Sequence, residues 1–195
     1  MQNYLIITSF ILGSYVLSSI SFALLISKFK KIDLRQVGSG NLGATNVYRA
    51  LGFKFAILVF ILDAAKGLVP TYLAMHYFSN PVWHVAIGLI TIIGHSLSIF
   101  VKFKGGKGVA TGLGVIMALN PLVAAILAAV GFTSIAITRY VAPTSILCAV
   151  MAPILFYVFK SPEEYIIFIS IIASVIVFRH KDNITRLIQG KENKV

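Results

Sequence analysis

Three polar stretches in this largely apolar sequence contain the residues that could do chemistry. The first, residues 37–49, contains Ser39, Asn41, Gly43, Thr45, Asn46 and Arg49. Its glycines allow sharp backbone turns that present N–H groups, and Arg49 offers a planar fork for a phosphate or carboxylate. This composition favours an oxyanion-binding loop. A flexible connection between helices, with Arg49 at a lipid headgroup, is the alternative.

The second stretch, residues 94–111, places lysines among glycines directly before a predicted helix start. Its central residues are Lys104, Gly105, Gly106 and Lys107. Ammonium groups beside the free N–H donors of a helix N-terminus are typical of a phosphate site. A plain basic loop would explain the lysines but not the glycines between them.

The third stretch, residues 178–192, contains His180, Asn183 and Arg186. If this stretch is helical, His180 and Asn183 share a face at positions i and i+3, and Arg186 continues that face. Their side chains can then converge on one ligand. An amphipathic helix lying on anionic lipid is the alternative.

Three further ionisable residues fall inside predicted membrane spans. His95 lies near the cytoplasmic end of one span, where an ionisable group is a functional candidate. A structural hydrogen bond to a neighbouring helix is the equal alternative. Asp63 and Lys66 would be costly if unpaired in lipid, so we expect them to pair with each other or with polar groups elsewhere. For this pair we expect a structural role rather than substrate contact.

The composition identifies lipid as the solvent. The chain has 195 residues, of which 58% are hydrophobic, and a mean hydropathy of +0.91, which is more apolar surface than one soluble core of this size would hold. Only 12% of the residues are charged, yet the net charge is +11, so the charges should meet anions. No separate basic domain suggests a nucleic-acid partner. We predict no metal, no cofactor and no obligate protein partner.

Apolar runs predict an all-α polytopic helical bundle, a single transmembrane domain over residues 1–195. About 20 apolar residues cross a hydrocarbon core of roughly 30 Å. Four runs reach that length: residues 4–26, 55–78, 82–101 and 141–159. Runs 122–138 and 165–178 are shorter, and run 109–119 is only half a span, a short tilted helix or one arm of a re-entrant hairpin. We predict seven transmembrane helices, or five if two short central segments fail to span.

The basic residues predict the orientation, because cytoplasmic loops retain lysine and arginine. Residues 28–54, 102–107 and 179–194, together with Arg139, hold 15 of the 17 lysines and arginines. Seven crossings with the N-terminus outside and the C-terminus cytoplasmic put all 15 on one face, and five crossings give the same orientation.

The three polar stretches together resemble the PlsY family, the acyl-phosphate:glycerol-3-phosphate acyltransferases of bacterial phospholipid synthesis. The family's first motif is similar to residues 39–49, its glycine-rich second motif to residues 94–111, and its third to residues 179–192, ending at Glu192. The three motifs occur in order over essentially the whole chain, and together they are specific.

The resemblance implies a multi-pass enzyme of the inner membrane with its active site on the cytoplasmic face. Such an enzyme transfers a fatty acyl group from acyl phosphate to the sn-1 hydroxyl of glycerol 3-phosphate, giving lysophosphatidic acid and phosphate. Phosphate binding is expected of Arg49, Lys104 and Lys107 with the neighbouring donors Asn41, Gly43, Thr45, Asn46, Gly105 and Gly106. Catalytic roles are expected of Ser39, His95, His180 and Asn183. The base is left open between His95, His180 and a substrate phosphate oxygen.

Two other functions fit parts of the sequence. A small-anion transporter would also use broken helices and a basic mouth, but it requires a polar path across the membrane. A non-catalytic lipid-binding protein would have no use for the glycine-rich motifs.

Overall fold

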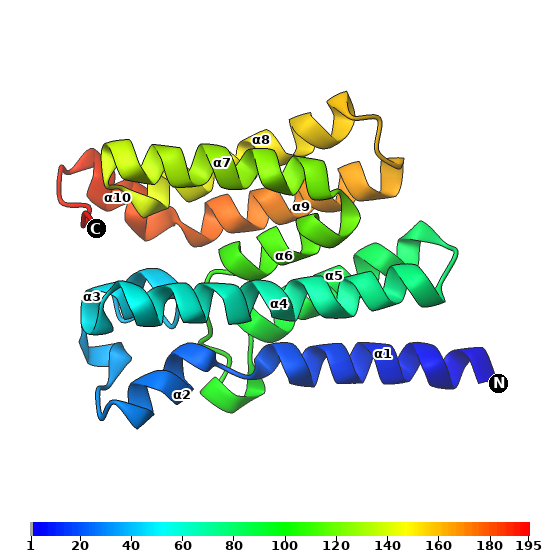
Figure 1. The fold of residues 1–195 in the computed structure, drawn as a ribbon, viewed down its shortest axis with the longest axis horizontal. Coiled ribbons are helices and arrows are strands. Elements are labelled where there is room, and N and C mark those ends of the chain that lie inside the picture. The colour runs from blue at the N-terminus through cyan, green and yellow to red at the C-terminus, as the bar shows by residue number, and fades with distance from the viewer. Residues whose placement is uncertain (1) are drawn as a thin grey trace.

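The computed structural model describes residues 2–195, and within that range every regular element is a helix (Figure 1). The long helices run side by side along one axis, and the two ends of the chain lie at opposite ends of the bundle. The elements in chain order are α1 (Gln2–Ser19), α2 (Phe22–Phe29), η1 (Leu34–Gln36), α3 (Ala44–Leu51), α4 (Phe53–Tyr77), α5 (Pro81–Ser96), η2 (Ile99–Val101), α6 (Val109–Leu119), α7 (Pro121–Thr138), α8 (Val141–Val158), α9 (Glu163–Arg179) and α10 (Lys181–Ile188).

Five apolar helical segments are long enough to cross a membrane: Tyr4–Phe29, Phe53–Tyr77, Pro81–Val101, Pro121–Thr138 and Val141–Val158. At 1.5 Å per residue, the 17 residues of α9 fall slightly short of the hydrocarbon core, and the 11 residues of α6 cover about half of it. The short helix predicted at residues 109–119 is confirmed, and it begins well inside the bundle (Figure 1).

The first predicted span is not one continuous helix. The sequence predicted a single run over residues 4–26, but α1 ends at Ser19 and α2 begins at Phe22. The Ser21 hydroxyl accepts a hydrogen bond from the Leu24 N–H and caps α2. The freed Ile20 carbonyl accepts a hydrogen bond from Lys66. The break is tolerated because a side chain satisfies a backbone group that lipid could not.

Close contact between α4 and α6 forms the centre of the bundle. A Cβ at Gly67 would overlap the carbonyl of Thr111, and one at Gly114 would overlap the carbonyl of Ala64. Small residues at a crossing let two membrane helices approach until their backbones touch. The half-length α6 therefore packs closely against α4 on one side, and it lies next to α7 and α9 on the other.

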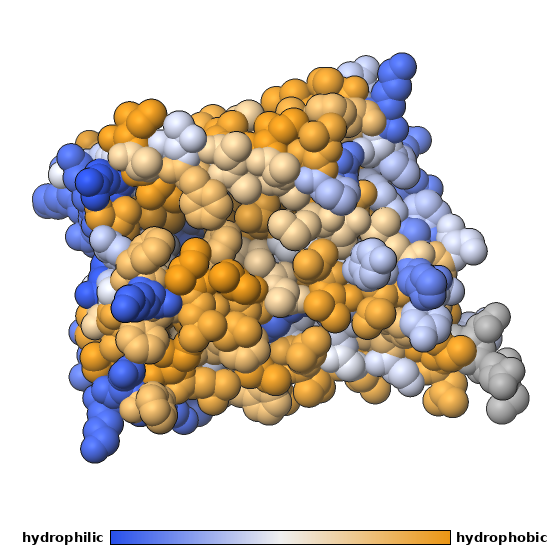
Figure 2. Space-filling view, viewed as in Figure 1, coloured by the Kyte–Doolittle hydropathy of each residue, from blue (hydrophilic) through white to orange (hydrophobic). Residues whose placement is uncertain are grey.

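The surface agrees with a lipid environment. Large apolar side chains such as Leu5, Ile61, Leu122 and Ile154 are exposed. Figure 2 shows apolar side chains over the middle of the molecule and hydrophilic ones toward its two ends. Exposed apolar surface on this scale identifies an integral membrane protein.

Candidate active site

A cavity of about 630 Å³ joins the three polar stretches to the interior of the bundle. One part of its wall carries polar side chains: Ser39, Asn41, Thr45, Arg49, Asp63, His95, Lys107, Arg139, His180, Asn183 and Glu192. The remaining wall is apolar and comes mainly from α4, α6, α7, α8 and α9, with residues such as Phe60, Leu113, Leu127, Ala152 and Ile172. The cavity is therefore amphiphilic.

The first stretch forms a compact loop leading into α3. Gly38 and Gly40 have φ values of +58° and +67°, a region that favours glycine. The buried Asn46 accepts hydrogen bonds at Oδ1 from the Ser39 N–H (3.0 Å) and hydroxyl (3.4 Å), and donates from Nδ2 to the Leu34 carbonyl (2.9 Å). Asn46 thus shapes the loop and does not line the cavity, whereas Ser39, Asn41, Gly43 and Thr45 do.

Arg49 projects from the last turn of α3 to the cavity wall. One guanidinium nitrogen, Nη2, donates to the Asn193 carbonyl at 3.1 Å, and Nε is buried without a hydrogen-bond partner among residues 2–195. Burial is the main cause that lowers the pKa of Arg49, but an arginine still carries its charge at neutral pH. The side chain therefore presents a charged donor that an anion could engage.

The second stretch separates its two predicted phosphate lysines. Lys107 lines the cavity and donates a hydrogen bond to Asn183 Oδ1. Lys104 is exposed and is not part of the lining. Burial lowers the pKa of Lys107, and the positive charge of Arg186 lowers it further, while Glu192 and Asp182 oppose this. Of the two lysines, only Lys107 lies where it could contact an anion in the cavity.

Gly105 and Gly106 hold the second stretch against α5. The Gly105 N–H donates to the Ser96 carbonyl at 3.0 Å, and a Cβ at Gly106 would overlap the His95 ring. The Gly106 carbonyl accepts a hydrogen bond from Arg179 Nη2 at 3.0 Å. These two glycines fix the path of the loop, and neither lines the cavity.

The third stretch places its polar side chains around the break between α9 and α10. His180 and Asn183 are both buried and line the cavity. Asn183 Nδ2 donates to Glu192 Oε1 at 2.7 Å, and Arg186 pairs with Glu192 Oε2 at 2.8 Å. Asn183 and Arg186 thus meet on one carboxylate of the chain itself, and their convergence on a bound ligand stays a prediction.

The ring of His180 has a defined proton. Its Nδ1 lies 2.8 Å from the Ile176 carbonyl, and because a carbonyl can only accept, Nδ1 must carry the hydrogen. Burial lowers the pKa of His180; the hydrogen bond to Ile176 opposes this and the charge of Lys107 adds to it. The neutral ring therefore has its lone pair at Nε2, where it can accept a proton.

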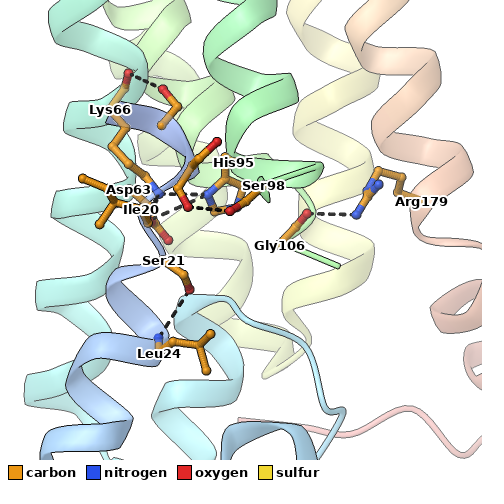
Figure 3. A network of polar contacts seen from close by, with 11 residues as sticks. Ile20, Ser21, Leu24, Asp63, Lys66, His95, Ser98, Gly106 and Arg179 are labelled. Atoms are coloured by element: carbon orange, nitrogen blue, oxygen red, sulfur yellow. Dashed lines mark hydrogen bonds and ion pairs between the residues drawn. The ribbon is translucent and has the colours of Figure 1, made fainter. Parts of the chain in front are cut away.

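The predicted pairing of Asp63 with Lys66 is confirmed, and His95 joins it. Lys66 Nζ lies 2.7 Å from Asp63 Oδ1 and 3.2 Å from His95 Nδ1. Figure 3 shows this network beside Ile20 and Ser98, with Gly106 and Arg179 close by. Asp63 and His95 also line the cavity, whereas Lys66 does not; the structural role expected for the Asp63–Lys66 pair stays a prediction.

Two residues that line the cavity were not assigned to the site from the sequence. They are Arg139, and Glu192, which was named only as the end of the third motif. Arg139 ends α7 in a left-handed conformation (φ 64°), and its carbonyl accepts a hydrogen bond from the Val195 N–H at 2.9 Å. One signal was available, since Arg139 is the only basic residue between the second and third stretches that was assigned to the cytoplasmic face. Arg139 lies outside all three polar stretches, so the sequence analysis did not assign it to the site.

The charges around the polar wall do not cancel. Asp63 is paired with Lys66 and Glu192 with Arg186, which leaves Arg49, Lys107 and Arg139 without a carboxylate partner among residues 2–195. A surplus of cations beside an apolar chamber suits a ligand that has an anionic head and an apolar tail. The fold and the site together define a polytopic membrane protein with an amphiphilic cavity that carries a surplus of positive charge.

Comparison with known proteins agrees with that class. A sequence model of the glycerol-3-phosphate acyltransferase family matches residues 8–190, so the chain belongs to that family. The glycerol-3-phosphate acyltransferase of Geotalea daltonii is 45% identical over 184 residues, covering 94% of each chain. That of Aquifex aeolicus is 42% identical over 185 residues, covering 94% of this chain and 96% of the other.

Two solved structures show the same fold. The crystal structure of PlsY, an integral membrane glycerol 3-phosphate acyltransferase, in its glycerol 3-phosphate form superposes with a TM-score of 0.93 at 40% identity, covering 97% of this chain and 95% of that one. Its lysophosphatidic acid form gives a TM-score of 0.90 at 39% identity, covering 96% and 94%. The family predicted from the three motifs is therefore confirmed.

Proposed function

We propose that this protein transfers a fatty acyl group from acyl phosphate to the sn-1 hydroxyl of glycerol 3-phosphate, yielding lysophosphatidic acid and inorganic phosphate. The observation that carries the proposal is an amphiphilic cavity with Arg49 and Lys107 on its polar wall and an apolar chamber beside them. One cavity of this kind can take a phosphate head, a reacting carbonyl and an acyl chain together. The relatives named for glycerol 3-phosphate and lysophosphatidic acid support the same substrate and product.

The cations have a clear task in such a reaction. Both reactants are phosphate anions, so their repulsion must be offset before the hydroxyl can approach the acyl carbonyl. Arg49, Lys107 and Arg139 supply positive charge, while Ser39 and Asn183 add neutral donors. Phosphate leaves readily once its charge is balanced, so no covalent acyl-enzyme is required.

His180 accounts for the proton. As the hydroxyl oxygen bonds to the carbonyl carbon, the carbon–oxygen bond to phosphate breaks and the hydroxyl proton must move to a base. His180 Nε2 carries a free lone pair and belongs to the cavity wall, which suits that role. A phosphate oxygen of the substrate is the competing acceptor.

We also propose seven crossings, with the N-terminus outside and the C-terminus and polar wall of the cavity on the cytoplasmic side. The opposite positions of the two chain ends support an odd number of crossings. The basic residues of the three stretches support the cytoplasmic assignment. In a bacterial inner membrane, the acyl chain would then enter from the lipid and glycerol 3-phosphate from the cytoplasm.

The test is a donor comparison with purified protein in detergent. Labelled glycerol 3-phosphate is mixed with palmitoyl phosphate or with palmitoyl-CoA, and the product is identified by mass and by acyl position. The proposal expects 1-palmitoyl-glycerol 3-phosphate from palmitoyl phosphate alone. Product from palmitoyl-CoA at an equal rate, or acylation at the second hydroxyl, would overturn the donor or the position respectively.

A further inference from the structure

The Asp63, Lys66 and His95 network has a geometry that defines which nitrogen of His95 carries a hydrogen. The Lys66 ammonium donates to the Ile20 carbonyl at 2.8 Å, lies 3.2 Å from His95 Nδ1, and forms an ion pair with Asp63 Oδ1 at 2.7 Å. An ammonium has no lone pair, so His95 Nδ1 must accept. The hydrogen of the neutral ring is then on Nε2.

The carboxylate does not offer an alternative partner for that ring. His95 Nδ1 lies 3.7 Å from Asp63 Oδ1, which is too long for a hydrogen bond. Asp63 instead pairs with Lys66, at 2.7 Å. The carboxylate therefore acts on His95 only through the ammonium group between them.

The donor at Nε2 lies beside Gly106, on a ring that lines the candidate active site. His95 lines the cavity, and Nε2 has no hydrogen-bond partner among residues 2–195. A Cβ at Gly106 would overlap Nε2 itself, so the glycine leaves this atom uncovered on that side. A ligand oxygen in the cavity is thus the natural partner for this N–H.

We infer that Asp63 and Lys66 are positioning residues that hold His95 as a hydrogen-bond donor to an anionic oxygen of the bound reactants. His95 therefore serves as a donor, and the base is elsewhere. This inference rests on the proposed function and adds to it, because it assigns opposite roles to the two histidines of the cavity. His180 presents a lone pair at Nε2, and His95 presents a hydrogen at Nε2.

Two substitutions of His95 distinguish a donor from a base. In His95→Gln the amide nitrogen takes roughly the place of Nε2 and can donate, but it cannot accept a proton. In His95→Asn the shorter amide can still meet Lys66 and does not reach the place of Nε2. A hydrogen bond to a charged group contributes about 1.5–3 kcal/mol, so losing it should lower kcat about 10- to 100-fold.

We therefore expect His95→Gln to retain kcat within about threefold, and His95→Asn and His95→Ala to lose about 10- to 100-fold. Turnover is measured with glycerol 3-phosphate and palmitoyl phosphate, and thermal unfolding in detergent verifies that each variant folds. Equal losses in the Gln and Asn variants would overturn the donor role. Absence of product from the unsubstituted protein would instead overturn the proposed function.

The positioning role has its own test. The double exchange Asp63→Asn with Lys66→Met removes both charges together, so it leaves no unpaired ion in the membrane. It should lower kcat about 10-fold in the natural background and less than about twofold when His95 is already Ala, because the pair acts through that ring. An equal loss in both backgrounds would refute the positioning role. Lys54→Met, an exposed exchange on the same helix, is the matched control.

Discussion

Lys107 donates a hydrogen bond to Asn183 although 76 positions separate them in the chain. This contact joins the glycine-rich second stretch to the histidine-bearing third stretch at the wall of one cavity. The first stretch completes the same wall through Ser39 and Arg49. Each stretch alone would resemble an ordinary basic loop, and their convergence places Arg49 and Lys107 on the wall of one cavity.

The two lysines of the second stretch should differ sharply in importance. Lys107→Ala removes a cation from the cavity wall and should lower kcat/KM about 100-fold, the size of effect expected for losing one charged donor to phosphate. Lys104→Ala removes an exposed ammonium and should stay within about twofold. Kinetics of both variants with both substrates measures the difference. Equal losses would show that Lys104 reaches the reactants in the working enzyme.

Arg49 should require its planar fork as well as its charge. Arg49→Lys keeps the charge but loses bidentate geometry, so KM for glycerol 3-phosphate should rise about 10-fold or more. Arg35→Lys, an exposed exchange in the preceding short helix, provides the control. Full activity in Arg49→Lys would contradict bidentate binding of phosphate.

The lowered pKa of His180 predicts that kcat falls at acidic pH. Because burial lowers the pKa of His180, the ring is neutral at neutral pH and gains a proton only as the pH falls below the ordinary histidine value of about 6.5. Protonation fills the Nε2 lone pair, so kcat should be level near neutrality and decline on the acidic side. His180→Gln should be slow at every pH and should lack that decline. The profile is measured from about pH 5 to about 8, and an identical acidic decline in the variant would assign the proton to substrate phosphate.

The apolar part of the cavity should set the acyl length. Ala152 is buried and lines the chamber, so Ala152→Phe would fill space that a long chain needs. Turnover of palmitoyl phosphate should fall about 10-fold or more relative to a short-chain acyl phosphate. Val150→Phe, on the exposed face of the same helix, should leave the ratio unchanged. A ratio that does not move in Ala152→Phe would place the acyl chain outside this chamber.

The helices were largely predictable from the sequence because lipid imposes a simple rule on them. Apolar runs bounded by Gly108, Asn120 or Arg139 became helices with those boundaries, since backbone groups in hydrocarbon must be paired within a helix. The break at Ile20 was not predictable from composition. It depends on Lys66, 46 positions away, supplying the missing hydrogen bond.

The three stretches that the sequence singled out meet at one cavity, but not every side chain expected at the site lines it. Residue type marked the three stretches, but whether a lysine faces the cavity depends on the turn of the loop, and Lys102 and Phe103 adopt positive φ there. That turn directs Lys107 inward and leaves Lys104 exposed. Asn46 likewise was expected to bind phosphate; in the fold it hydrogen-bonds Ser39 and Leu34 and does not line the cavity.

The most direct test of the central claim is a double-mutant cycle between the second and third stretches. Lys107→Ala, Asn183→Ala and the double variant are compared by kcat/KM with glycerol 3-phosphate and palmitoyl phosphate. If both side chains serve one bound phosphate group, the double variant should lose little more than Lys107→Ala alone, because the losses of a shared site do not add. Losses that multiply fully would mean that the two residues act independently, and would contradict a site built jointly from the separate stretches.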